Sequence, residues 1–150
     1  MRAVVQRVDF ASVTVAGETV GRIGRGLLVL LAVQQDDGLS DLEFMTRKLL
    51  NLRVFNDEEG KMNLSIRDVG GAFLIVSQFT LYGDCRKGNR PSFSRSAPPE
   101  RAQAWYEKLV DEIRAAGCPV ETGSFQEMMK VQLVNDGPVT LIVDSRKEFF

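Results

Sequence analysis

The chain has 150 residues, of which 44% are hydrophobic and 26% are charged, and its formal net charge is −1 at pH 7. These values are typical of one globular domain with a full core and give no global signal for nucleic-acid binding. The sequence contains no histidine, which excludes Ser-His and Cys-His nucleophiles and zinc sites that contain histidine. Any catalysis must therefore use carboxylates, hydroxyls, Lys, Arg, backbone groups or a group of the substrate.

Neither a membrane helix nor a signal peptide is evident in the sequence. The longest apolar run is short, and the first residues follow a strand pattern. The cytoplasm is therefore the expected location. Cys85 and Cys118 lack the spacing of a metal or redox motif, so we expect two free thiols, no metal site and no cofactor.

Strands predominate in the first third of the predicted structure. Apolar and alternating patterns predict strands at 3–8, 12–15, 18–23 and 27–33, with turn residues between them. A helix is predicted to begin where Ser40 and Glu43 form a capping box and to end near Asn51 or Leu52.

The remainder of the chain is predicted to contain further strands and a second long helix. The predicted elements are a short strand at 53–55, a long strand at 72–81, a helix from Pro98-Pro99 to near Gly117, a strand at 120–122, a short helix capped by Ser124 and Glu127, and strands at 129–134 and 139–143. This order favours a single α+β domain spanning residues 1–150. We expect a curled antiparallel or mixed sheet or barrel with the two main helices packed outside it.

Polar residues end the strand predicted at 72–81. Ser77-Gln78-Phe79-Thr80 precedes a glycine-containing loop, so its polar groups could face a cleft or belong to a solvated edge strand. Thr80 would need a base to act as a nucleophile, and Asp84 is a weak candidate. A positioning or backbone role is favoured for this segment.

A basic loop follows at 86–95. It contains four cations and no acidic residue, which suits phosphate contacts, with Phe93 available to stack on a base. The alternative is a solvated loop whose cations pair elsewhere.

Phe125 and Met129 lie four residues apart and would share one face of the short helix predicted there. Such a pair is commonly part of a core. It could also form an apolar slot for a planar group such as adenine, and periodicity does not separate the two interpretations.

Gly137-Pro138 lies between the last two predicted strands, and the residues alone favour an ordinary turn. About 5% of X-Pro bonds in folded proteins are cis. A cis bond here would direct two successive carbonyls to the same side and could exclude one substituent from a small pocket.

Two segments taken together resemble the signature motifs of the D-aminoacyl-tRNA deacylases. They are Ser77-Gln78-Phe79-Thr80 and Asn135-Asp136-Gly137-Pro138-Val139-Thr140. The similarity extends from the opening residues 1–8, through 87–93, to the last strand. It implies a barrel-like homodimer with active sites at the interface, which hydrolyses the ester of D-aminoacyl-tRNA.

The resemblance also implies roles for individual residues. Gly137-Pro138 would be cis and would insert into the partner's site, where its carbonyls reject L-aminoacyl groups; glycyl-tRNA, which has no side chain, would be a second substrate. Ser77, Gln78, Phe79 and Thr80 would position the ester, with backbone N–H groups of Phe79 and Thr80 at the oxyanion and the terminal 2′-OH of the tRNA assisting water. The adenosine would bind to Phe125 and Met129, and the tRNA contacts would include Arg86, Lys87 and Arg90.

Two other functions remain open at this point. One is a tRNA- or nucleotide-binding module without catalysis. The other is an esterase with Thr80 as nucleophile.

Overall fold

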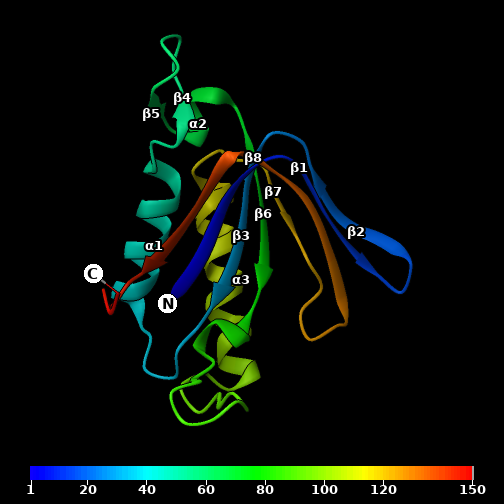
Figure 1. The fold of residues 1–150 in the computed structure, drawn as a ribbon, viewed down its shortest axis with the longest axis vertical. Coiled ribbons are helices and arrows are strands. Elements are labelled where there is room, and N and C mark those ends of the chain that lie inside the picture. The colour runs from blue at the N-terminus through cyan, green and yellow to red at the C-terminus, as the bar shows by residue number, and fades with distance from the viewer. Residues whose placement is uncertain (150) are drawn as a thin grey trace.

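A computed structural model describes residues 1–149 of the chain (Figure 1). The elements are β1 (Arg2–Val15), β2 (Glu18–Ile23), β3 (Gly26–Ala32), α1 (Leu39–Asn51), β4 (Phe55–Asn56), β5 (Met62–Leu64), α2 (Ile66–Val69), β6 (Ala72–Ser77), the 3₁₀ turn η1 (Phe79–Tyr82), α3 (Pro99–Ala115), β7 (Val120–Thr122) and β8 (Met129–Asp144). None of the helices in this part of the chain is long and apolar enough to cross a membrane.

One curled, mixed sheet forms the centre of the molecule. Its order is β2-β1-β3-β6-β7, with β8 also paired to β1, and β4 and β5 form a separate hairpin. β1 is antiparallel to β2, β3 and β8, whereas β6 runs parallel to β3 and β7. The edge strands β2 and β7 approach so closely that a Cβ on Gly21 would overlap the carbonyl oxygen of Thr122. The sheet is therefore nearly closed into a barrel.

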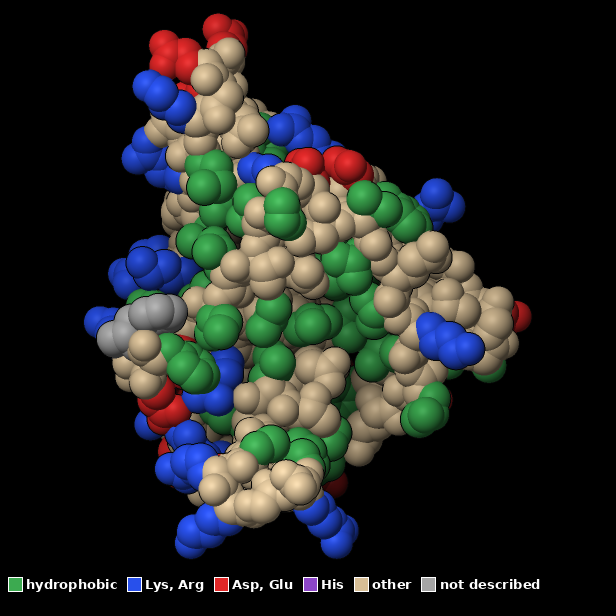
Figure 2. Space-filling model, viewed as in Figure 1, with side chains coloured by type: hydrophobic (Ala, Val, Ile, Leu, Met, Phe, Trp, Pro, Cys, Tyr) green, Lys and Arg blue, Asp and Glu red, His purple; other side chains and the backbone are tan. Residues whose placement is uncertain are grey.

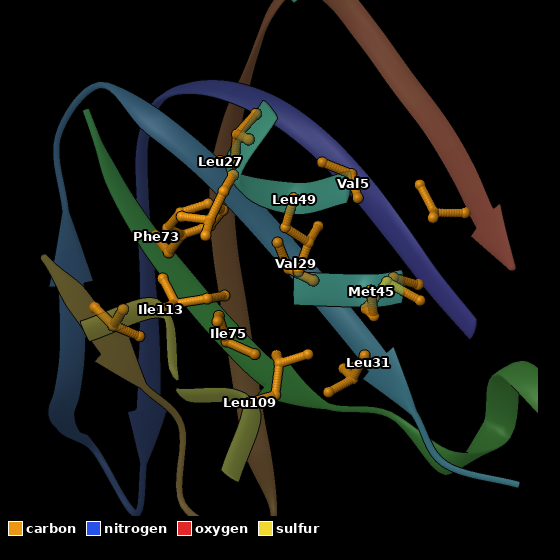
Figure 3. Close-up of a cluster of buried hydrophobic side chains, with 14 of the residues drawn as sticks. Val5, Leu27, Val29, Leu31, Met45, Leu49, Phe73, Ile75, Leu109 and Ile113 are labelled. Carbon is orange, nitrogen blue, oxygen red and sulfur yellow. The ribbon is translucent and has the colours of Figure 1, made fainter. Parts of the chain in front are cut away.

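The main core lies between this sheet and the two long helices (Figure 3). Alternate residues of β3 and β6 point toward the helices, namely Leu27, Val29, Leu31, Phe73 and Ile75. The helices contribute Met45 and Leu49 from α1 and Leu109 and Ile113 from α3, each pair at the i, i+4 spacing of one helical face. The other face of β3 and β6 is buried in a second cluster, which explains why both strands are continuously apolar. The predicted α+β fold with two outer helices is confirmed.

The longest strands were divided incorrectly by the sequence patterns. Residues 3–8 and 12–15 belong to the single strand β1, and residues 129–144 form the single strand β8 rather than two strands joined by a turn. The reason is that β1 and β8 pair with each other from end to end. The residues that interrupt the strand pattern lie at register shifts in this pairing, between Gln6 and Phe10 of β1. Gly137, with φ +99°, provides the bend within β8.

Several shorter features also differ from the predictions. α1 begins after Gly38, whose N–H donates to Asp41 Oδ2 at 3.0 Å, so the capping residues are not Ser40 and Glu43. The strand from Ala72 ends at Ser77, and η1 follows. Residues 124–128 form a turn instead of a helix, and the sequence patterns missed β5 and α2.

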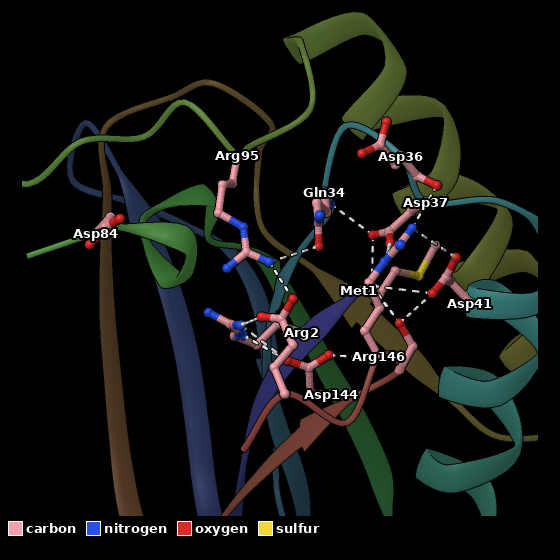
Figure 4. A network of polar contacts seen from close by, with 12 residues as sticks. Met1, Arg2, Gln34, Asp36, Asp37, Asp41, Asp84, Arg95, Asp144 and Arg146 are labelled. Atoms are coloured by element: carbon pink, nitrogen blue, oxygen red, sulfur yellow. Dashed lines mark hydrogen bonds and ion pairs between the residues drawn. The ribbon is translucent and has the colours of Figure 1, made fainter. Parts of the chain in front are cut away.

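A network of charges holds the two ends of the chain together (Figure 4). The α-amine of Met1 lies 2.7 Å from Asp37 Oδ2. Arg2 Nη2 lies 2.7 Å from Glu148 Oε2, and Glu148 also pairs with Arg95. Because Arg95 precedes the residues that line the cavity described below, the network fixes one wall of that cavity.

Candidate active site

A cavity of about 620 Å³ opens where β3 and β6 end. Its wall combines the ends of both strands, η1, the segment before α3, and the turn that leads into β8. The lining residues are Ala32, Val33, Val76, Ser77, Gln78, Phe79, Phe93, Ser96, Ala97, Pro99, Ala102, Phe125, Gln126, Glu127, Met128, Met129 and Val131. Loops at the carboxyl ends of strands are a common place for a ligand site.

The polar motif that ends β6 contributes three residues to this cavity. The N–H of Gln78 donates to the carbonyl of Leu31 at 2.7 Å, which fixes the backbone at the point where it leaves the sheet. Ser77, Gln78 and Phe79 line the cavity, whereas Thr80 is exposed and lies outside its lining. The Thr80 hydroxyl accepts a hydrogen bond from Gln78 Nε2.

The first N–H groups of η1 have no partner among the residues that the structure describes. Helical turns leave their first backbone donors unpaired, and among residues 1–149 the N–H groups of Phe79 and Thr80 donate to no acceptor. Two adjacent free donors at the edge of an apolar cavity can stabilise a negatively charged oxygen.

The cavity has little acid–base chemistry of its own. Within the described chain its lining has one ionisable side chain, Glu127, which is exposed. The side-chain hydrogen bond from Arg86 holds the pKa of Asp84 far below its usual range, which makes Asp84 a poor base for Thr80. No group of three or more metal-ligating side chains occurs in residues 1–149.

Phe125 and Met129 both face the cavity, although no helix joins them. Phe125 lies in the turn and packs against the core, with its ring centroid 6.1 Å from that of Tyr106. Met129 begins β8, and its Sδ accepts a hydrogen bond from the N–H of Ser124 at 3.4 Å. The core and slot interpretations are therefore compatible, because each side chain is partly buried and also lines the cavity.

Gly137 and Pro138 lie far from the cavity of their own chain. Ser77 of β6 pairs with Leu31 of β3, and Leu31 pairs in turn with Ala3 of β1. On β8, Gly137 lies between Asn135 and Thr140, which pair with Val8 and Gln6 of β1. The two levels are therefore separated by about four residues of strand, or about 13 Å. The sequence motifs are not brought together within one chain.

The expected cis bond between Gly137 and Pro138 is wrong for this structure, because no cis peptide bond occurs in residues 1–149. The bend comes instead from the positive φ of Gly137 and from the register shift between β1 and β8. Arg7 packs beneath the bend: its Nε donates to the carbonyl of Asp136 at 3.2 Å, and its Nη1 donates to the carbonyl of Val54 at 2.6 Å.

The three candidate tRNA contacts lie in the loop beside the cavity, outside its lining. Arg86 pairs with Asp84 at 2.6 Å, whereas Lys87 and Arg90 are exposed and have no acidic partner in the described part of the chain. Lys and Arg side chains project from this lowest loop in Figure 2. The alternative in which the loop's cations pair elsewhere therefore applies to Arg86, and also to Arg95 through Glu148.

Several wall residues were not predicted from the sequence. Ser96 and Ala97 reach the cavity because the segment before α3 pairs with the residues after β3, as in the bond from Ala97 N–H to the carbonyl of Val33 at 2.9 Å, and Ala102 follows in the first turns of α3. Their small size leaves space for a ligand, but no local pattern marks them.

Comparison with known proteins decides the family. The family model of D-Tyr-tRNA(Tyr) deacylase matches residues 4–144. The chain belongs to this family. It is 60% identical over 149 residues to the D-aminoacyl-tRNA deacylase of Syntrophobacter fumaroxidans, covering 99% of this chain and 100% of that protein. The corresponding protein of Koribacter versatilis is 63% identical with the same coverage.

Two solved structures share the fold of this deacylase family member. One is described as a c-Myc DNA unwinding element binding protein; it has a TM-score of 0.91 and 46% identity, covering 96% of this chain and 98% of its own. The other is described as a probable eukaryotic D-amino acid tRNA deacylase. It has a TM-score of 0.81 and 22% identity, covering 95% of this chain and 98% of its own. The second supports the fold alone.

Proposed function

We propose that the protein hydrolyses the ester of D-aminoacyl-tRNA and releases the D-amino acid and the tRNA. Its membership of the deacylase family over residues 4–144 supports the reaction class. The observation that carries the mechanism is a cavity with two free backbone N–H groups and no side-chain nucleophile–base pair among the described residues. Such a site suits a reaction whose catalytic group arrives with the substrate.

The terminal adenosine fits the apolar part of the cavity. Phe125 and Met129 supply a partly buried aromatic ring and a thioether, which can contact the faces of a planar base. The ester carbonyl then lies toward the N–H groups of Phe79 and Thr80. Ser77 and Gln78 position the backbone that presents these donors.

The chemistry follows from this placement. A water oxygen attacks the ester carbonyl carbon, and the two N–H groups stabilise the negative oxygen that forms. The neighbouring ribose hydroxyl of the substrate assists the attack by relaying a proton from the water, and the bond between the acyl carbon and the ribose oxygen breaks as that oxygen takes up the proton that the water loses. The protein contributes positioning, which can be worth several orders of magnitude in rate.

Selection against L-aminoacyl groups is assigned to the Gly137–Pro138 bend of a second copy of the chain. The bend is too far from its own cavity to contact a ligand there, and it is exposed on the surface. The exposed surface of β8 includes the hydrophobic residues Val134, Leu141 and Ile142, and hydrophobic side chains gather over this region in Figure 2. A homodimer through this face would bring main-chain carbonyls of the bend to the partner's cavity.

This filter excludes L side chains with the main-chain carbonyl oxygens of the bend, and it does not require a cis peptide bond. Carbonyl oxygens near the α-carbon would collide with the side chain of an L-aminoacyl group, whereas a D side chain points elsewhere. Glycine has no side chain to reject, so glycyl-tRNA is a second substrate in this proposal.

Three measurements test the proposal. Release of D-tyrosine from D-tyrosyl-tRNA tests the activity, and binding without release would favour a nucleic-acid-binding module, the alternative suggested by the name of the 46% identical structure. Thr80→Ala should retain turnover; its loss would favour the Thr80 esterase. Replacement of the terminal 2′-OH by hydrogen should abolish turnover, and undiminished turnover would contradict catalysis by the substrate.

A further inference from the structure

A pair of exposed aromatic rings stands at the rim of the cavity. We propose that Phe79 and Phe93 form a stacking site for a second nucleobase, that of the nucleotide preceding the terminal adenosine. This inference rests on the proposed function, because it extends the same cavity toward the rest of the RNA.

The geometry of the two rings suits a base. Their centroids are 5.2 Å apart and their planes cross at 71°, so the edge of one ring meets the face of the other. Phe79 is 53% exposed and Phe93 is 37% exposed. An edge-to-face pair leaves ring faces open to solvent, and flat nucleobases stack on such faces without regard to sequence.

The rim is held in place by the backbone around it. Asp84 and Ser92 exchange two backbone hydrogen bonds of 2.7 and 3.0 Å, which fix the base of the loop that carries Phe93. Ser96 Oγ donates to the carbonyl of Phe79 at 3.2 Å, and the N–H of Ser96 donates to the carbonyl of Phe93 at 3.1 Å. Ser96 therefore links both halves of the pair, and a ligand would meet a preformed surface.

Gly83 is the residue that allows this arrangement. A Cβ at that position would lie 3.1 Å from Phe93 Cε1 and 3.0 Å from the carbonyl oxygen of Thr80. Any larger residue would press on the ring and on η1 at the same time. The close packing explains why the ring of Phe93 is directed to the cavity rim although it belongs to an exposed loop.

Charge identifies the occupant as a nucleotide. Lys87 and Arg90 lie in the same loop, and no acidic partner neutralises them within residues 1–149. Unpaired cations beside stacking rings are the usual composition of a single-stranded nucleic-acid site. Because both rings also line the cavity proposed for the terminal adenosine, the adjoining nucleotide is the one within reach.

The decisive experiment compares substrates with and without that nucleotide. D-tyrosyl-tRNA and D-tyrosyl-adenosine would be hydrolysed by the wild type, Phe93→Ala and Phe93→Tyr. Loss of one stacked base should raise the KM for the tRNA ester roughly tenfold more than the KM for the adenosine ester in Phe93→Ala. Phe93→Tyr keeps a ring and should restore the wild-type ratio of the two KM values.

Two controls keep the result interpretable. Phe10→Ala removes a phenylalanine of β1 that lies outside the cavity lining and should leave the ratio unchanged. Equal changes in KM for both esters, or no change for either, would overturn the second base site. Thermal denaturation of each variant identifies a loss that comes from misfolding.

A binding measurement tests the stacking site independently of the proposed function. The dinucleotide CpA should bind to the wild type more tightly than adenosine does, and Phe93→Ala should abolish the difference in calorimetry. If the wild type hydrolyses neither ester, the proposed function fails, while the CpA measurement still decides the stacking site. Equal affinities of CpA and adenosine for the wild type would refute the site whatever the outcome with the esters.

Discussion

Substitution of Gly137 by alanine should destabilise the bend in β8 for two separate reasons. The first is backbone strain, because Gly137 has φ +99°, a conformation that L residues rarely adopt. The second is a collision: a Cβ would overlap Arg7 Nη2 and lie 3.1 Å from Arg7 Cζ. Strained backbone in a non-glycine residue costs about 1–3 kcal/mol.

Arg7 has little freedom to move away from the new methyl group. Its side chain is 7% exposed, and it forms an ion pair with Asp136 at 3.1 Å. It also donates hydrogen bonds to the carbonyls of Asp136 and Val54 at 3.2 and 2.6 Å. Hydrogen bonds of a charged group contribute about 1.5–3 kcal/mol each, so the total loss in the free energy of unfolding should be about 3–5 kcal/mol.

Urea unfolding of Gly137→Ala measures this loss, and two further variants separate the causes. Gly17 has φ +81° with no atom within 4 Å of an added Cβ, so Gly17→Ala reports strain alone. In an Arg7→Ala background, Gly137→Ala should cost no more than Gly17→Ala does. A Gly137→Ala protein within about 0.5 kcal/mol of the wild type, the range of ordinary surface substitutions, would refute the reasoning.

The other predictions concern buried hydroxyls, acid stability and the adenosine slot. Tyr106→Phe removes a 2.6 Å hydrogen bond to a carbonyl of β6 and should lower the free energy of unfolding by about 1–2 kcal/mol. Tyr82→Phe is its matched control, because the buried Tyr82 hydroxyl has no partner in residues 1–149; it should be neutral or stabilising, and an equal loss in both variants would contradict this account. The hydrogen bond from Arg95 lowers the pKa of Glu148, so this carboxylate stabilises the folded state above its ordinary pKa of 4.5 and loses that contribution as the pH falls through its lowered pKa. Glu148→Gln should therefore flatten the fall in Tm between about pH 5 and 3, and an unchanged slope would exclude the pair as a contributor. Phe125→Ala should raise the KM for D-tyrosyl-tRNA about tenfold, as expected for loss of one base contact; a loss in kcat alone would place Phe125 outside the adenosine slot.

The fold class was predictable because long apolar patterns define the principal elements. β2 and β7 have the predicted bounds, and α3 begins at the proline pair that marks its first turn. The errors arise where pairing between distant strands overrides local residue preferences. Gly137 and Pro138 resemble a turn by themselves, but β1 supplies a continuous partner that keeps them within β8.

The candidate site was predictable in part, for a related reason. Ser77, Gln78 and Phe79 line the cavity because they end a buried strand, and the apolar pattern of β6 marks that end. Ser96 and Ala97 also line the cavity, through contacts with residues far away in sequence, and nothing in their local pattern identifies them. The free N–H groups of η1 depend on backbone geometry, which residue types do not specify.

The positions of the two sequence motifs relative to each other could not be predicted from the sequence. They resemble parts of one site, yet the Gly137–Pro138 bend and Ser77 lie at different levels of the same sheet. A second copy of the chain is therefore essential to the account of selectivity. Without it, the cavity could hold an adenosine and an ester but would have no contact with the bend.

Parallel hydrolysis of D-tyrosyl-tRNA and L-tyrosyl-tRNA is the most direct test of the central claim. We expect rapid release of D-tyrosine and no enzymatic release of L-tyrosine at the same enzyme concentration. Comparable rates for the two esters would contradict selection by exclusion of the L side chain.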